Sequence, residues 1–531
     1  MLLNDKILVG KSGDKELFIL PKMANRHGLI TGASGSGKTI TLKVMAESFS
    51  DAGVPVFLAD VKGDLAGTAM MGEVNENIQE RLDALNITDF EPKSFPVRFW
   101  DIYGENGHPV RANVEQVGPE ILSMMLGLTE AQEGNLAIAF EVAEDEQLPL
   151  INLEDLRAVL AYVAENKDKY VTKYGNITTQ SIGVIQRSLL TLEKQGADKF
   201  FGEPALDIND FFAVDKDGRG VINTLHAVKL FESPDLYASF LLWLLTSLFS
   251  QTNEVGDLDK PKMVFFFDEA HLLFNGMPTY RLKRITQVVK LIRSHGIGLY
   301  FISQRPTDIP DEIMSQLGNR VQHTLRAYTP AEQKIVKASA DSFRTNPEFD
   351  TAEAILALGT GEALVSFQDA KGAPNIVEKA TILPPQSQMG VIDGIARQKI
   401  INESPFVGKY DTAIDPDSAF ERIQRMKAEL AEQAISEGII EQPVQYKGES
   451  PEDIQRRNIE AFNAKLRENQ AANQVVPQQQ QAAPAKTTKT TKVSQSKLEK
   501  YADRAVGNMV GSASSAVGRN LMNKFLKSFF K

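Results

Sequence analysis

The chain has 531 residues, enough for one large α/β domain with appendages or for two domains. Its hydrophobic fraction of 42% and charged fraction of 24% are ordinary for a soluble globular protein. It contains no cysteine, which excludes disulfides and thiolate metal sites and is compatible with a reducing compartment. The net charge of −11 argues against a broad exposed DNA-binding face, although a local basic channel is not excluded.

The sequence shows neither a signal peptide nor a membrane-spanning segment. Residues Met1–Lys6 lack the basic and long apolar regions of a signal peptide. The longest apolar stretch, Phe240–Leu245, is far shorter than the ~20 residues that a membrane-spanning helix requires, so it predicts a buried core helix. We therefore expect a cytoplasmic protein without an integral membrane segment.

The first motif along the chain is a phosphate-binding loop. Residues 32–39 match the pattern G-x-x-x-x-G-K-[ST], between a strand-like run and a helical run. Its glycines let backbone N–H groups point at phosphates, and the following helix adds its N-terminal dipole. We expect Lys38 to bridge the β- and γ-phosphates of ATP and Thr39 to bind Mg²⁺. The predicted nucleotide-binding residues are Gly32, Ala33, Ser34, Gly35, Ser36, Gly37, Lys38, Thr39 and Ile40.

Strand candidates separated by helical stretches follow this loop, and one of them ends in the acid Asp60. A long helical pattern at about 117–200 predicts an insertion packed on the sheet. This alternation predicts an α/β fold of the P-loop NTPase (RecA/FtsK-like) type, with a parallel-rich sheet flanked by helices, over residues 1–385. The expected strands are 17–20, 28–31, 54–60, 95–100, 220–225, 263–267, 298–302, 321–325 and 361–367.

A second motif follows the apolar run Met263–Phe267, which is typical of a strand buried on both faces of a parallel sheet. The run ends in two acids. Asp268 is predicted to hold the Mg²⁺ shell, and Glu269 to orient and deprotonate the attacking water. His271, two residues on, is interpreted as a packing or hydrogen-bonding residue rather than a proton shuttle. Together with the phosphate-binding loop, these acids predict a nucleotide hydrolase.

The next apolar strand, Gly298–Ile302, ends in Ser303, Gln304 and Arg305. Gln304 is a candidate for sensing the γ-phosphate or holding the attacking water. Arg305 is either a phosphate-facing arginine or a salt-bridged strand end, and the sequence does not choose between them.

Beyond residue 385 the composition changes. Residues 386–468 predict a helical extension, 469–497 a low-complexity linker, and 498–531 a basic amphipathic tail. The segment 486–531 holds ten Lys and Arg against two acids. Its phenylalanines favour docking on a protein partner or a neighbouring subunit, while its charge leaves DNA phosphates or a membrane surface as alternatives.

Four motifs in order carry a family resemblance: G-A-S-G-S-G-K-T, A-D-V-K-G-D, F-F-F-D-E-A-H and Y-F-I-S-Q-R-P. Over about residues 15–370 the chain resembles the HerA-like members of the FtsK–HerA ring ATPases. It looks closest to a bacterial group that lacks the N-terminal β-barrel of archaeal HerA. The resemblance implies a hexameric ring with ATP between subunits and DNA in the central channel. It also implies an arginine finger from the neighbouring subunit at Arg293, with Arg305 as the other candidate, and a functional acid at Asp60.

The leading hypothesis is therefore a ring-forming, Mg²⁺-dependent ATPase that acts as a DNA translocase or helicase. A second hypothesis is an ATPase that remodels a protein or switches a partner without moving DNA. A membrane-associated secretion or conjugation ATPase is a third, which the lack of a spanning segment disfavours.

Overall fold

The computed structural model describes residues 1–436, 443 and 449–473. The chain forms two compact units, Met1–Ile423 and Gln424–Lys531. The first unit continues well past residue 385, where the composition changes. Most of the predicted linker 469–497 and all of the predicted tail 498–531 lie outside the described residues.

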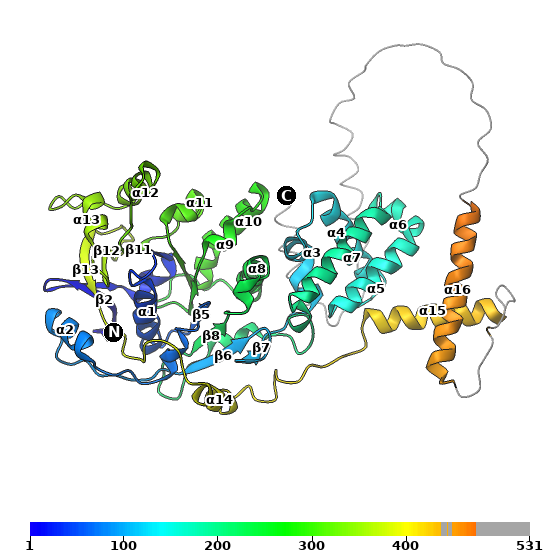
Figure 1. The fold of residues 1–531 in the computed structure, drawn as a ribbon, viewed down its shortest axis with the longest axis horizontal. Coiled ribbons are helices and arrows are strands. Elements are labelled where there is room, and N and C mark those ends of the chain that lie inside the picture. Colours follow the sequence, from blue (N-terminus) through cyan, green and yellow to red (C-terminus); the bar gives the residue numbers. More distant parts are fainter. Residues whose placement is uncertain (437–442, 444–448, 474–531) are drawn as a thin grey trace, which may run out of the picture. The chain divides into compact units, whose positions relative to one another are not determined.

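A thirteen-stranded sheet forms the centre of the first unit (Figure 1). Its strand order is β1-β2-β13-β12-β11-β4-β10-β9-β5-β8-β6-β7, and β3 pairs with β2. The strands are β1 Leu2–Leu3, β2 Lys6–Ser12, β3 Lys15–Ile19, β4 Gly28–Thr31, β5 Val56–Asp60, β6 Val97–Asp101, β7 His108–Pro109, β8 Ile222–His226, β9 Met263–Phe267, β10 Ile297–Ser303, β11 Asn319–Gln322, β12 Glu362–Ser366 and β13 Glu378–Ile382.

The sheet has a parallel body and an antiparallel margin. All neighbouring strands from β11 to β7 run parallel, whereas β12, β13, β2, β1 and β3 pair antiparallel. The predicted α/β class with a parallel-rich sheet is confirmed. All nine expected strands are present, although several are shifted by one to three residues.

Helices cover the sheet and form the insertion. The helices are α1 Lys38–Asp51, α2 Glu76–Ala84, α3 Val114–Met125, α4 Glu130–Asp145, α5 Leu153–Glu165, α6 Lys167–Tyr174, α7 Thr179–Lys194, α8 Pro234–Gln251, α9 His271–Phe274, α10 Thr279–Leu291, α11 Asp311–Met314, α12 Pro330–Asp341, α13 Thr351–Ala357, α14 Gly394–Asn402, α15 Ala419–Ser436 and α16 Pro451–Asn473. Helices α3–α7 gather as one group in Figure 1, and α3 packs on α8. This group occupies the region in which the sequence predicts a helical insertion.

The strand β9 shows why a continuous apolar run is needed at the centre of this sheet. Val264 and Phe266 belong to the core cluster that includes α1 residues. On the alternate positions, Phe265 stacks on Phe57 of β5, and Phe267 stacks on Phe301 of β10. Every residue of β9 is therefore buried, as expected for a strand covered on both faces.

The helix α8 contains the apolar stretch Phe240–Leu245, which is buried as predicted. Most of its other residues are buried too. Within the part of the chain that the structure describes, no helix is both long enough and apolar enough to cross a bilayer.

Two buried charges on α1 hold the chain segment 386–388, which follows the last strand. Glu47 accepts hydrogen bonds from the backbone N–H groups of Gln386 (2.7 Å) and Ser387 (3.2 Å), and from the Ser387 hydroxyl. Lys43 donates to the backbone carbonyl of Gln388. Burial raises the pKa of Glu47 and lowers the pKa of Lys43 to about 8, so both charges depend on these partners.

We expect Glu47→Ala to lower the free energy of unfolding by ~1–3 kcal/mol, because it leaves buried N–H groups without an acceptor. The loss should appear as a lower midpoint in urea unfolding. The matched control is Glu403→Ala, which removes an exposed glutamate paired with Lys399 and should change the midpoint little. Equal midpoints for the two variants would contradict the anchoring role of Glu47.

Candidate functional site

Polar residues follow the carboxyl ends of adjacent parallel strands, and these ends meet at one edge of the sheet. The phosphate-binding loop follows β4, Gln304 follows β10, and Asp268 and Glu269 follow β9. Asp60 ends β5 next to β9, and His323 follows β11 next to β4. Most of the predicted site residues, from four separate chain segments, are thus brought to the same edge.

The loop 32–39 has the backbone that its glycines allow. Gly35 and Gly37 have φ values of +76° and +114°, which side chains with a Cβ rarely adopt. A Cβ on Gly37 would also lie 3.3 Å from Gly361 in the turn before β12. Lys38 turns back over the loop and donates to the backbone carbonyls of Gly32 (2.6 Å) and Ala33 (3.1 Å). Burial lowers the Lys38 pKa, while the charge of Glu269 opposes that shift.

A histidine that the sequence reading did not select supports this loop from behind. The Nδ1 atom of His323 lies 2.8 Å from the backbone carbonyl of Glu362, so it must donate there. Its Nε2 atom then accepts from the Thr41 hydroxyl on α1 at 2.8 Å. Burial lowers the His323 pKa to about 4, and the Lys38 charge acts in the same direction. His323 is therefore a neutral link between α1 and β12. No sequence signal pointed to it, because His323 lies in the middle of the expected strand 321–325, whereas β11 ends at Gln322.

The two acids after β9 are held close together. The Asp268 carboxylate accepts the backbone N–H of Glu269 at 2.9 Å, and the Tyr237 hydroxyl donates to the Asp268 carbonyl at 2.8 Å. Glu269 has a left-handed backbone, with φ of +47°. Burial and then the charge of Glu269 raise the pKa of Asp268 to about 6, while Lys62 and Lys38 oppose this. A bound cation would reduce the repulsion between these two carboxylates, so the site suits a divalent metal bound together with phosphates.

Asp60 is buried and faces its own loop. One carboxylate oxygen accepts the backbone N–H of Gly63 (2.8 Å), and the other accepts that of Ala66 (3.2 Å). Burial and the charge of Asp64 raise the Asp60 pKa to about 6. Asp60 thereby fixes the turn that carries Lys62, whose ammonium lies 3.9 Å from the Glu269 carboxylate. A direct catalytic role of Asp60 stays a prediction.

The two arginine candidates lie at opposite edges. Arg293, in the short helical turn Ile292–His295, precedes β10, whereas Gln304 and Arg305 are exposed immediately after it. A strand of this length spans ~20 Å, more than an arginine side chain can cross. Arg293 is therefore out of reach of the phosphate-binding loop of its own chain.

The residues present fit a magnesium nucleotide. Among the described residues, the buried Ser36 hydroxyl has no hydrogen-bond partner, and neither has one buried oxygen of Glu269. A Cβ on Gly35 would meet open space, and Lys38 supplies a positive charge beside the N-terminus of α1. Donors for phosphate oxygens and carboxylates for a metal thus face each other across β10. Thr39 and Asp268 are the residues that would hold the metal.

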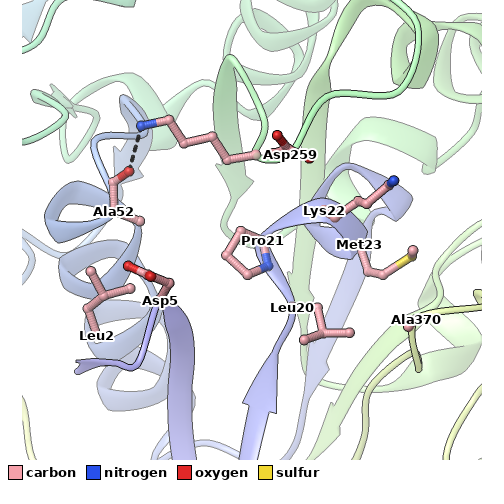
Figure 2. A pocket seen from close by; sticks show the side chains of 10 residues that line it. Leu2, Asp5, Leu20, Pro21, Lys22, Met23, Ala52, Asp259 and Ala370 are labelled. Atoms are coloured by element: carbon pink, nitrogen blue, oxygen red, sulfur yellow. Dashed lines mark hydrogen bonds between the residues drawn. The ribbon is translucent and has the colours of Figure 1, made fainter.

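Figure 2 shows a different pocket, at the edge where the parallel strands begin. Its lining contains no residue of the phosphate-binding loop and neither of the acids after β9. Lys260 is one of its lining residues and donates to the Ala52 carbonyl at 2.8 Å. The pocket is lined by Leu2, Asp5, Leu20, Pro21, Lys22, Met23, Ala52, Asp259, Lys260 and Ala370.

Comparison with known proteins gives consistent matches. A family model described as "Helicase HerA-like C-terminal" matches residues 5–529. The DNA double-strand break repair helicase HerA of Sulfurisphaera tokodaii is 25% identical over 385 residues, which cover 68% of this chain and 66% of that protein. The HerA helicase of Saccharolobus solfataricus is 23% identical over 375 residues, covering 67% and 64%. The chain spans about two thirds of the length of these relatives.

Among solved structures, the plasmid coupling protein TrwB in complex with the ATP analogue ADPNP has a similar fold. The TM-score is 0.50 at 12% identity, and the match covers 72% of this chain and 91% of that chain. At this identity the likeness concerns the fold.

The raised pKa of Asp268 has a consequence for stability. The folded chain binds the proton of the Asp268 carboxyl more tightly than the unfolded chain does, so the folded state loses stability as pH rises between about 4 and 6.

We expect Asp268→Asn, in metal-free buffer, to raise the melting temperature by ~1–3 °C at pH 7.5. This gain should disappear near pH 4. Exposed Asp259→Asn is the control and should give no such pH-dependent gain. A lower melting temperature for Asp268→Asn at pH 7.5 would contradict this electrostatic reading.

Proposed function

On the premise that this chain belongs to the Helicase HerA-like C-terminal family, we propose that it is a ring-forming ATPase that translocates along or unwinds DNA. The observation that carries the proposal is the convergence of the phosphate-binding loop with Asp268 and Glu269 at one sheet edge. The names of the relatives support DNA as the substrate.

In the proposed reaction, the loop N–H groups and the N-terminus of α1 hold the ATP phosphates, and Lys38 neutralises the β- and γ-oxygens. Thr39 and Asp268 would hold Mg²⁺, which would supply a Lewis acid to polarise the phosphoryl group. Glu269 accepts the proton of the attacking water. Gln304, exposed at the end of β10, orients that water or senses the γ-phosphate.

A neighbouring subunit supplies the remaining positive charge in this proposal. Within one chain the length of β10, ~20 Å, lies between the edge that carries Arg293 and the edge that carries the loop, so Arg293 could act only on the site of a neighbouring subunit in a ring. Arg305, on the nucleotide edge, is the other candidate. Hydrolysis would then depend on assembly.

The first experiment tests hydrolysis. Lys38→Ala should abolish tight ATP binding, whereas Glu269→Gln should keep ATP binding and lower turnover by ~10²–10⁴-fold. ATP binding is measured with a fluorescent analogue and turnover by phosphate release. Near-normal turnover of Glu269→Gln would overturn its assignment as the base.

The DNA arm of that experiment uses the same wild-type protein, with double-stranded or single-stranded DNA added. A DNA translocase should hydrolyse ATP faster with one of the two. ATP hydrolysis that neither DNA changes would instead favour the protein-remodelling hypothesis.

The second experiment tests the source of the arginine. Arg293→Ala should bind ATP normally and hydrolyse it ~10³-fold more slowly or worse. Mixing Arg293→Ala with Glu269→Gln subunits should restore some turnover, because mixed interfaces can pair an intact Glu269 with an intact Arg293. Verified mixed oligomers that stay inactive would argue that Arg293 does not act between subunits.

A further inference from the structure

Glu269 is a buried carboxylate with an incomplete set of partners. Its residue is 8% exposed, and its Oε2 atom has no hydrogen-bond partner among the described residues. Its left-handed backbone, unusual for a residue with a Cβ, also needs support from the surroundings. A base in this condition is oriented chiefly by the charges around it.

Two side chains supply positive or potentially positive charge within 4 Å of Glu269. The Lys62 ammonium lies 3.9 Å from Oε1, and Nδ1 of His271 lies 3.5 Å from Oε2. His271 follows Glu269 closely on the same chain segment, so its position moves with that segment. Lys62 follows β5 rather than β9, so its position does not depend on the segment that carries Glu269.

The backbone around Lys62 is held firmly, whereas its side chain is not. The Asp60 carboxylate, two residues before Lys62, accepts the backbone N–H groups of Gly63 and Ala66, which follow Lys62. The Lys62 side chain is 51% exposed, against 11% for that of Glu269. An ion pair at 3.9 Å with a half-exposed lysine adds little to stability, so the effect to examine is the one on the position of Glu269.

We propose that Lys62 is a positioning residue which, through its ion pair, holds Glu269 in the orientation from which it activates water. The turn after β5, which Asp60 fixes, thereby helps to orient the proposed catalytic base that follows β9. This role rests on the proposed ATPase function and adds a residue to it.

The test compares Lys62→Met with Lys229→Met by steady-state and single-turnover hydrolysis of ATP. Lys229 is a close match: it lies in the turn after β8, pairs with Glu105 at 2.7 Å and is 53% exposed. Displacing a catalytic group by about 1 Å can cost ~10²-fold in rate, so we expect Lys62→Met to lower kcat by ~10–100-fold. ATP affinity and melting temperature should stay unchanged, Lys229→Met should behave as wild type, and Lys62→Arg should recover part of the rate.

A double variant separates positioning from direct contact with the nucleotide. If Lys62 acts through Glu269, Lys62→Met should cause no further loss of single-turnover rate in the Glu269→Gln background. A further loss there, or weaker ATP binding by Lys62→Met, would overturn the proposal in favour of a phosphate contact. Wild-type turnover in Lys62→Met would also overturn it, whereas failure of the wild-type protein to hydrolyse ATP would overturn the proposed function itself.

Discussion

The parallel direction of β11, β4, β10, β9 and β5 is the constraint on which the candidate site depends. Side chains near the carboxyl ends of these strands must share one edge, however far apart they lie in the sequence. Loop 32–39 and the acids after β9 are more than 200 residues apart in the chain, yet only β10 separates their strands. The buried aromatic faces of β9 keep this register fixed.

Side chains of opposite charge lie near one another at that edge of the sheet. Lys38 and Lys62 face Asp268 and Glu269, and each of these lysines lowers the pKa of Asp268. In the folded chain Lys38 donates hydrogen bonds to two backbone carbonyls of its own loop, and other acceptors can take their place. A phosphate is a stronger partner for an ammonium than a neutral carbonyl. Lys38 therefore makes weak contacts that it can exchange for stronger ones with a phosphate.

The sequence sufficed for the parts of the molecule that are encoded locally. The continuous apolar run of β9 and the glycine pattern before Lys38 predicted a strand and a loop that the structure contains, and the four motifs led to a family that the comparisons confirm. The strands β2 and β13 were not predicted. Their pairing joins Lys11 to Thr381, which are far apart in the chain, so the local sequence of either segment does not predict it.

Long-range contacts also explain the site residues that the sequence did not indicate. His323 is defined by Thr41 and by the Glu362 carbonyl, and neither is near it in the chain. Lys62 lies within a motif that drew attention to Asp60, but only the folded arrangement brings it to Glu269. Arg293 shows the reverse case, because the family resemblance selected it and the fold sets it at the opposite edge of its own sheet.

The anchoring of Gln386 and Ser387 by Glu47 bears on how the chain is made. Helix α1 leaves the ribosome early, but the donors to its buried carboxylate follow about 340 residues later. At typical elongation rates this is a delay of roughly 20–70 s. During that time the Glu47 carboxylate can remain hydrated only if α1 has not yet packed against the sheet. Completion of α1 is therefore tied to the end of synthesis of the first unit, and a nascent chain would acquire the finished form of loop 32–39 among the last features to form.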